Sequence, residues 1–253
     1  PSTRGTEVGT KLVTLTPDNP ERGLPVIQGV YVLFGAPGAP GQAPRAVLDG
    51  VELTGLRTSA VSTLGVRLLA DASPRHLVVF GTGVQAWEHA LTFQDVFGLE
   101  RVSVVGRDAD RAAALAARIE AELGVTASTA DSDVVVTCTA ATAPLFDGTL
   151  VPEHATVVAM GSHTTDARET DDALARRATV AVESRDSAAR EAGDVTLAID
   201  SGALAGIEDT VTLAELVAGT ARRREGAPAL FVTTGMPWQD LVVASAVARE
   251  VLG

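Results

Sequence analysis

The chain has 253 residues, enough for one large domain or two smaller ones. Its formal net charge is −12 and its isoelectric point is about 4.7, which argues against nucleic acid or an anionic membrane as a partner. The single cysteine, Cys138, excludes an internal disulfide framework and predicts a cytoplasmic protein. No apolar run reaches transmembrane length, and no Cys/His cluster has the spacing of a zinc site.

The first fifth of the chain alternates short apolar runs with turn signals. Strands are predicted at residues 11–16, 26–34 and 46–48, with loops at residues 19–25 and 35–41 between them. We expect these strands to form an antiparallel sheet. A helix is predicted at residues 58–70, where Val61, Leu64 and Leu68 share one face. Pro74 marks the end of this region.

A glycine-rich turn then follows a buried strand. Residues 77–80 are apolar and rich in β-branched side chains, which predicts a strand covered on both faces. Gly81-Thr-Gly-Val-Gln-Ala86 comes next and leads into a helix. This order is the dinucleotide-binding fingerprint. Gly81 would form the tight turn, Gly83 would let the backbone approach a pyrophosphate, and Ala86 would let helix and strand pack closely.

Strands and helices alternate through the rest of the chain. Further strands are predicted at residues 101–105, 134–137, 156–160 and 179–182. Asp108 or Asp110 can cap the helix after the first of these strands, and Gly124 ends it. This alternation predicts an α/β fold with a parallel sheet. Residues 219–228 are predicted to be a loop whose arginines face solvent, and a last helix is predicted from Pro237.

Several segments together resemble the ornithine cyclodeaminase/mu-crystallin family over essentially the whole chain. They are Lys11-Leu-Val-Thr, Asn19-Pro-Glu-Arg-Gly-Leu-Pro25, Leu48-Asp-Gly, Leu53-Thr-Gly-Leu-Arg-Thr-Ser-Ala60, Gly81-Thr-Gly-Val-Gln-Ala86, Asp133-Val-Val-Val-Thr-Cys-Thr139, Met160-Gly, Glu191-Ala-Gly-Asp194 and Thr233-Thr-Gly-Met236. The resemblance implies a Rossmann domain at residues 73–228. It also implies a β-rich substrate and dimerisation domain, made of residues 1–72 and 229–253 and completed by the C-terminal helix. Members form dimers and carry several dozen residues upstream of Pro1, so we expect a missing N-terminal segment.

The resemblance assigns two cations to the substrate. Arg57 would hold the α-carboxylate of a small amino, imino or keto acid, because a planar guanidinium binds a carboxylate through two hydrogen bonds. The alternative role for Arg57 is that of a partner in a surface ion pair. Lys11 is the only lysine in the sequence, and it would face the substrate, where a buried amine can transfer a proton. The alternative role for Lys11 is that of a charged residue on an edge strand, which opposes aggregation.

The resemblance also places the cofactor contacts. They are Thr58, Gly81, Thr82, Gly83, Val84, Gln85, Ala86, Arg107, Asp108, Thr137, Cys138, Thr139, Met160 and Gly161. Arg107 follows the second strand of the fingerprint unit, where an arginine accommodates the 2′-phosphate of NADP. NADP(H) is therefore expected over NAD(H). Asp108 leaves this preference open, because it could cap the helix or bind the ribose of NAD. Cys138 is expected to be a small packed residue.

His163 departs from the family pattern, since cyclodeaminases carry aspartate at that position. A histidine is a poor partner for an ammonium group but can protonate an imine. We therefore expect an NAD(P)H-dependent oxidoreductase that reduces imines of α-keto acids, with Lys11 or His163 as the proton donor. The alternatives are an ornithine or lysine cyclodeaminase that recycles its cofactor, and an NADP-dependent small-ligand-binding protein of the mu-crystallin type.

Overall fold

The computed structural model describes residues 7–16, 18–24, 26–36, 42–127 and 132–252. Residues 1–6, 25 and 37–41, which belong to the predicted chain start and loops, lie outside the described residues. The chain forms two compact units, one from residues 1–61 and 235–253 and the other from residues 62–234. The sequence places these boundaries at 72/73 and 228/229 instead.

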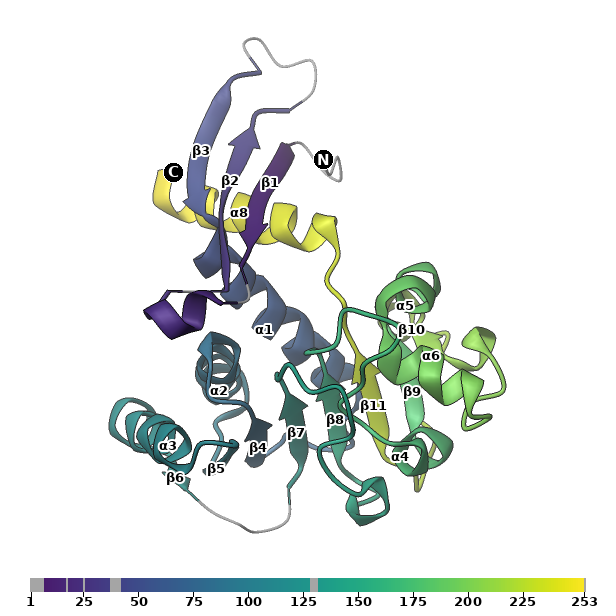
Figure 1. The fold of residues 1–253 in the computed structure, drawn as a ribbon. Helices are drawn as coiled ribbons and strands as arrows, with labels where there is room; N and C mark the ends of the chain where they lie inside the picture. Colours follow the sequence, from purple (N-terminus) through teal and green to yellow (C-terminus); the bar gives the residue numbers. More distant parts are fainter. Residues whose placement is uncertain (1–6, 17, 25, 37–41, 128–131, 253) are drawn as a thin grey trace. The chain divides into compact units, whose positions relative to one another are not determined.

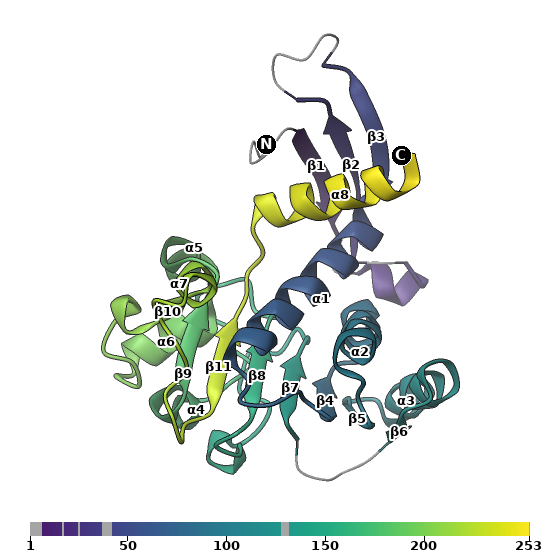
Figure 2. The ribbon, with the colours of Figure 1, turned by 180° about the vertical axis from the view of Figure 1, so that it is seen from behind.

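The first unit contains the predicted antiparallel sheet, which is confirmed. Its strands are β1 (Val8–Leu15), β2 (Ile27–Phe34) and β3 (Pro44–Asp49), and a short 3₁₀ helix, η1 (Asn19–Arg22), lies between the first two (Figure 1). The last helix, α8 (Pro237–Leu252), covers one face of this sheet, as expected (Figure 2). Leu33 of β2 and Leu241 of α8 are fully buried in the core between them.

Helix α1 (Gly50–Leu69) begins eight residues before its predicted start at residue 58. The side chain of Asp49 explains the difference. One of its carboxylate oxygens accepts hydrogen bonds from the backbone nitrogens of Val51 at 2.7 Å and Glu52 at 3.2 Å, which satisfies the first turn of the helix. The apolar repeat alone begins only at Val61, so it misses this first turn.

The second unit is built on a parallel sheet, as predicted. Its strands are β4 (His76–Phe80), β5 (Arg101–Val105), β6 (Thr126–Ala127), β7 (Val134–Thr137), β8 (Thr156–Ala159), β9 (Thr179–Val182), β10 (Val211–Thr212) and β11 (Ala229–Val232). In the part of the chain that the structure describes, their order is β10-β9-β11-β8-β7-β4-β5-β6. The strand order reverses between β4 and β7, which is the switch point where Rossmann folds bind nucleotides.

Strand β11 explains why the second unit extends to residue 234. No strand is predicted at these residues from the sequence, yet β11 pairs with both β8 and β9 in the large sheet. Phe231 of this strand is fully buried, and Gly65 of α1 lies against its ring. Residues 229–232 therefore belong to the large sheet, and the second unit extends to residue 234.

Two long helices follow the first two strands of the large sheet. They are α2 (Val84–Phe97) and α3 (Ala109–Leu123), each close to its predicted position. The short helices α4 (Asp172–Arg177), α5 (Arg185–Glu191), α6 (Gly193–Asp200) and α7 (Leu213–Ala218) are additions that the sequence analysis does not predict, as are the 3₁₀ helices η2 (Gly148–Leu150) and η3 (Ile207–Asp209). Helices of two turns carry too few apolar residues for their periodicity to be recognised.

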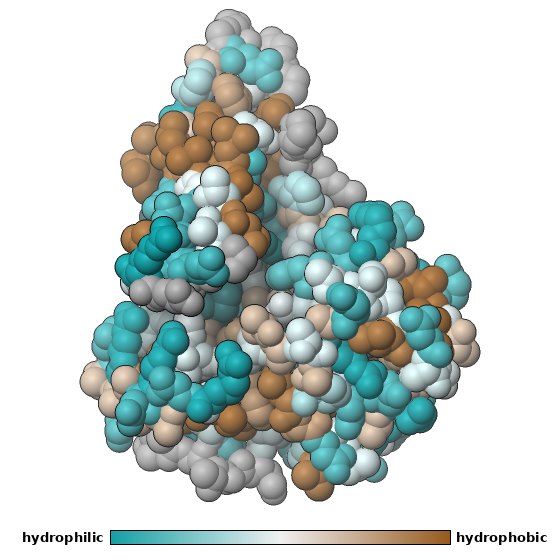
Figure 3. All heavy atoms as spheres, in the orientation of Figure 1, coloured by the Kyte–Doolittle hydropathy of each residue, from teal (hydrophilic) through white to brown (hydrophobic). Residues whose placement is uncertain are grey.

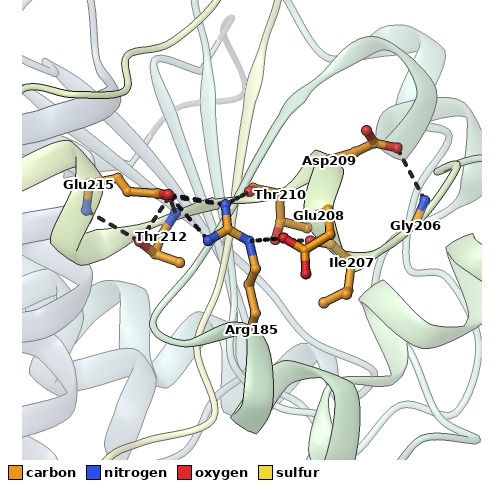
Figure 4. A network of polar contacts seen from close by, with 8 residues as sticks. All are labelled: Arg185, Gly206, Ile207, Glu208, Asp209, Thr210, Thr212 and Glu215. Carbon is orange, nitrogen blue, oxygen red and sulfur yellow. Dashed lines mark hydrogen bonds and ion pairs between the residues drawn. The ribbon is translucent and has the colours of Figure 1, made fainter.

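Arg185 holds several of these short elements together at the β10 edge of the sheet (Figure 4). Its guanidinium donates a hydrogen bond to the carbonyl oxygen of Thr210 at 2.6 Å and to both carboxylate oxygens of Glu215 at 3.1–3.2 Å. Glu215 also caps α7 by accepting from the backbone nitrogen of Thr212 at 2.7 Å. This backbone bond and the Arg185 side chain hold the pKa of Glu215 below its usual range.

The prediction that the arginines of residues 219–228 face solvent is wrong for Arg223. This side chain is buried and donates hydrogen bonds to the carbonyl oxygens of Leu69 and His154 at 3.0 Å, and to that of Ala227 at 2.7 Å. Its guanidinium thus satisfies backbone carbonyls from three separate segments, which a charge count cannot anticipate.

Neither a membrane span nor a metal cluster is found among the described residues. None of their helices is both long enough and apolar enough to cross a bilayer. They also contain no group of three or more His, Cys, Asp or Glu side chains placed to hold a metal ion.

Candidate active site

A cavity of about 700 Å³ lies at the carboxyl ends of β4, β5 and β7, in the second unit. It is lined by Phe80, Gly81, Thr82, Val105, Gly106, Arg107, Asp108, Arg111, Cys138, Thr139, Ala140, Ala141 and Leu145. These residues follow the strands on either side of the topological switch point, where the fold leaves room for a dinucleotide.

The glycine-rich turn has the backbone that the fingerprint requires. Gly81 has a φ of +133°, and a Cβ there would lie 2.8 Å from both the carbonyl oxygen and the sulfur of Cys138, so only glycine fits. Gly83 precedes α2 with an ordinary φ of −94°, and no other residue lies within 4 Å of a Cβ built there. Ala86 is fully buried. The N-cap residue of α2 is Gly83, which has no side chain to cap the first amides of the helix, and such a helix start can receive an anion.

Two arginines and a carboxylate line the side of this cavity beyond β5. Arg107 and Arg111 are both exposed, and Arg111 is a residue that the sequence analysis does not single out. Asp108 acts as the cap of α3, because its carboxylate accepts a hydrogen bond from the backbone nitrogen of Arg111 at 3.0 Å. Of the two roles considered for Asp108, helix cap and ribose ligand, the structure shows the helix cap.

The turn after β7 forms another part of the cavity wall. The thiol of Cys138 donates to the carbonyl oxygen of Phe80 at 3.2 Å, and burial raises its pKa, so it stays protonated and unreactive. Thr139 follows it into the cavity lining, whereas Thr137 is fully buried behind the wall.

A buried carboxylate, Glu169, stands behind this turn, and sequence reasoning misses it. Its side chain accepts hydrogen bonds from Thr137 at the end of β7, and from Thr139 and Gly161, which follow β7 and β8. A second buried carboxylate, Asp194, accepts from the backbone nitrogens of Glu169 at 3.1 Å and Thr170 at 2.7 Å. Burial raises the pKa of Asp194. The sequence signal for this pair is that Asp194 lies in one of the segments that resemble the family, and that Glu169 ends the segment 160–169, which aligns with the family around His163.

A second cavity, of about 300 Å³, lies within the first unit. It is lined by Gly9, Thr10, Lys11, Tyr31, Arg57, Gly235, Met236, Pro237 and Asp240. The two cations that the resemblance assigns to the substrate, Lys11 and Arg57, therefore share one cavity. They reach it from β1 and α1, although Lys11 and Arg57 lie 46 positions apart in the sequence.

Asp240 of α8 balances these cations, and the sequence analysis does not identify it. Lys11 Nζ lies 2.9 Å from Asp240 Oδ1, while Arg57 Nε lies 3.7 Å from the same oxygen. Arg57 also donates to the side-chain oxygen of Gln239 at 3.2 Å. Among the described residues, none accepts a hydrogen bond from the buried Arg57 Nε. Arg57 is thus a mostly buried cation that lines the cavity, and a guanidinium in such a place can bind a carboxylate ligand.

Tyr31 adds a phenol to the same cavity, directly across the sheet from Lys11. Its ring packs in the core beneath α8. Burial, with Asp240 and Glu7 nearby, raises the pKa of Tyr31 to about 12, so its hydroxyl stays protonated near neutral pH.

The remaining predicted site residues lie away from the lining of either cavity. Thr58 is buried in the first unit, where its hydroxyl donates to the backbone of Thr54 at 2.6 Å. His163 is exposed in the second unit, on the segment between β8 and α4. The others are Val84 and Gln85 in the first turn of α2, and Met160 and Gly161 directly after β8.

Known proteins are similar to this chain in sequence and in fold. The chain is 32% identical over 242 residues to the ketimine reductase mu-crystallin of Mus musculus, covering 94% of this chain and 74% of that protein. It is 36% identical over 249 residues to a Δ1-pyrroline-2-carboxylate/Δ1-piperideine-2-carboxylate reductase of Azospirillum brasilense, covering 96% of this chain and 76% of that one. The Δ1-pyrroline-2-carboxylate reductase of Thermococcus litoralis, solved with NADH and L-proline, superposes with a TM-score of 0.88 at 26% identity, over 96% of this chain and 78% of that one.

The family model described as ornithine cyclodeaminase/mu-crystallin matches residues 1–253. It covers both the unit that holds Lys11 and Arg57 and the unit that holds the Gly81–Ala86 turn. This chain therefore belongs to the ornithine cyclodeaminase/mu-crystallin family.

Proposed function

We propose that this protein is an NAD(P)H-dependent reductase of imines derived from α-keto acids. The observation that carries the proposal is Arg57, a mostly buried guanidinium that lines a cavity of about 300 Å³ together with Lys11. A small carboxylate ligand fits this arrangement. The relatives that are named as ketimine and Δ1-pyrroline-2-carboxylate reductases support the same reaction class.

The proposed reduction needs a carboxylate anchor and a proton donor, and the first unit offers both. Arg57 would hold the α-carboxylate and so orient the imine carbon. Lys11 lines the same cavity as Arg57, with its Nζ 2.9 Å from Asp240 Oδ1, so we assign to Lys11 the proton that the imine nitrogen gains. Bound NAD(P)H would supply the hydride to the imine carbon. These assignments for Arg57 and Lys11 follow the expectations from the sequence.

A substrate panel tests the reaction. With NADPH, the wild type should reduce a cyclic imine acid and release little ammonia from ornithine in the presence of NADP⁺. Lys11→Met should lower kcat by about 100-fold, as expected for loss of a general acid, whereas His163→Ala should change it less than about threefold. Ammonia release from ornithine that equals or exceeds imine reduction would identify a cyclodeaminase instead. Binding of NADPH without turnover of any imine would identify a binding protein.

We propose further that NADP(H) is preferred over NAD(H). Arg107 and Arg111 both line the cavity beyond β5, and the Asp108 carboxylate is engaged as the cap of α3. Two cations there would attract the 2′-phosphate, whereas an aspartate free to bind the ribose would favour NAD. Relatives solved with NADH or NAD⁺ support a nicotinamide dinucleotide of either kind.

Replacing Arg107 tests the cofactor preference. Arg107→Asp should weaken NADPH binding by about 2 kcal/mol and NADH binding much less, because only NADPH carries the phosphate. Arg101→Asp is the matched control, since Arg101 is an exposed arginine at the opposite end of β5. Calorimetric titration with both cofactors gives the ratio of affinities. An unchanged ratio in Arg107→Asp would mean that Arg107 does not contact the phosphate.

We also propose a homodimer that pairs the exposed faces of the three-stranded sheets. The face of this sheet away from α8 carries Leu12, Val30 and Val47, whose exposed fractions are 66%, 43% and 69%. Figure 3 shows apolar side chains gathered over this sheet. An exposed apolar sheet face of this kind is typical of an interface. A related archaeal alanine dehydrogenase is a dimer. The predicted cytoplasmic location stays a prediction.

Light scattering at micromolar concentration tests this assembly. The wild type should have the mass of two chains, and Val47→Glu should shift it to one, because a charge in an apolar interface is costly to bury. Val217→Glu is the control, since Val217 is 63% exposed on α7 of the other unit. A wild type that is monomeric, or a Val47→Glu dimer, would contradict the proposed interface.

A further inference from the structure

The carboxylate of Glu169 meets four hydrogen-bond donors and is fully buried. Its Oε1 accepts from the backbone nitrogen and the hydroxyl of Thr139, both at 2.7 Å. Its Oε2 accepts from the hydroxyl of Thr137 at 2.8 Å and the backbone nitrogen of Gly161 at 2.7 Å. An ionised carboxylate is an acceptor with about four lone-pair sites, so this one is saturated.

These four bonds connect the ends of two neighbouring strands. Thr137 and Thr139 belong to the end of β7 and the turn that follows it, whereas Gly161 follows β8. The approach is close, because a Cβ on Gly161 would lie 2.0 Å from the carbonyl oxygen of Thr139 and 2.7 Å from Glu169 Oε1. Glu169 therefore fixes both segments in one position.

The position of the β7 turn decides the shape of the nucleotide cavity. Thr139 lines the cavity itself. Cys138, between the two threonines, donates its backbone nitrogen to the carbonyl oxygen of Phe80 at 2.9 Å. Its carbonyl oxygen and sulfur also occupy the space beside Gly81, where a Cβ would come within 2.8 Å of them. A shift of the turn would thus move both the cavity wall and the support of the glycine-rich turn.

We infer that Glu169 is a positioning residue for dinucleotide binding, which it serves by holding residues 137–139 and 161 behind the cavity wall. This inference rests on the proposed NAD(P)H-dependent function. Glu169 is not a catalytic residue, since it is buried behind the lining. Asp194 holds Glu169 in turn, by accepting a hydrogen bond from its backbone nitrogen.

Glu169→Gln tests the inference because it keeps the shape and changes the hydrogen bonding. An amide has one oxygen, so its NH₂ group must face the backbone N–H of either Thr139 or Gly161, whichever way it is turned. The threonine hydroxyls can rotate to accept, but a backbone N–H cannot. The turn after β7 should therefore move, and the dissociation constant for NADPH should rise by at least about tenfold.

Asp133→Asn is the matched control. The carboxylate of Asp133 accepts from the backbone nitrogens of Arg75 at 2.8 Å and His76 at 2.9 Å, at the amino ends of the neighbouring strands β4 and β7. The control makes the same acid-to-amide change away from the cavity. Its amide oxygen can keep both backbone hydrogen bonds, so NADPH affinity should stay within about twofold of wild type. NADPH binding is measured by fluorescence titration, below the melting temperatures of both the Glu169→Gln and the Asp133→Asn variants. KM is measured for NADPH and for a cyclic imine acid.

A rise in the dissociation constant and in KM for NADPH, with KM for the imine acid unchanged, is the expected result for Glu169→Gln. NADPH affinity of this variant within twofold of Asp133→Asn would overturn the inference and leave Glu169 a purely structural residue. If Glu169→Gln does not fold, Thr137→Val decides, because Thr137 is buried and contacts the wall through Glu169. A wild-type dissociation constant in that variant overturns the inference equally. Failure of the wild type itself to bind NADPH would instead refute the proposed function.

Discussion

Replacing Gly83 with valine is expected to weaken the binding of both NADPH and NADH by at least about 100-fold, and to leave the free energy of unfolding nearly unchanged. The backbone of Gly83 tolerates a side chain, because its φ is −94° and no other residue lies within 4 Å of a Cβ built there. The same open space, at the start of α2, is where the fingerprint places the pyrophosphate. A valine would fill it and keep the phosphates from the helix amides.

Calorimetry with each cofactor and urea unfolding of the free protein measure the two effects of Gly83→Val separately. Gly206→Val is a matched control, because Gly206 also has extended backbone and no neighbour within 4 Å of its Cβ position. That variant should bind both cofactors like the wild type. If Gly83→Val binds NADPH with wild-type affinity, the glycine-rich turn does not hold the pyrophosphate and the assignment of the larger cavity is wrong.

The second large effect is expected at Arg57. Arg57→Met should raise KM for an imine acid by about 100- to 1000-fold, because the carboxylate loses a charged, bidentate partner in a mostly buried site. Binding of NADPH should stay at the wild-type level. Methionine is a good helix former of similar length, so α1 should persist. Arg57→Lys should recover only part of the loss, since an ammonium cannot reproduce the planar fork.

Steady-state kinetics with the imine acid as the varied substrate test this expectation. Arg67→Met is the control, because Arg67 is an exposed arginine on the same helix. It should leave KM unchanged. An Arg57→Met variant whose KM for the imine acid matches wild type would show that the carboxylate binds elsewhere, and it would remove the main support for the proposed reaction.

The order of strand, glycine-rich turn and helix could be predicted from the sequence because its determinants are local. Residues 77–80 form a short apolar run, Gly81 meets a steric need of its own turn, and α2 has a regular apolar repeat. The first three strands and the last helix were equally visible in short apolar patterns. The short helices α4 to α7 were not, because two turns of helix are stabilised by packing and by caps such as Thr212 and Asp171 more than by periodicity.

Sequence by itself thus determined the α/β fold class, the antiparallel first region and the residues of the glycine-rich turn, since each depends on neighbours within a few positions. Only the tertiary structure decided which charged groups meet. Asp240 reaches Lys11 across 229 positions of sequence, and Glu169 reaches Thr137 across 32. Strand β11 likewise joins the large sheet by pairing with distant strands. A buried carboxylate or a central strand is defined by its partners, and the chain brings those partners together only when it folds.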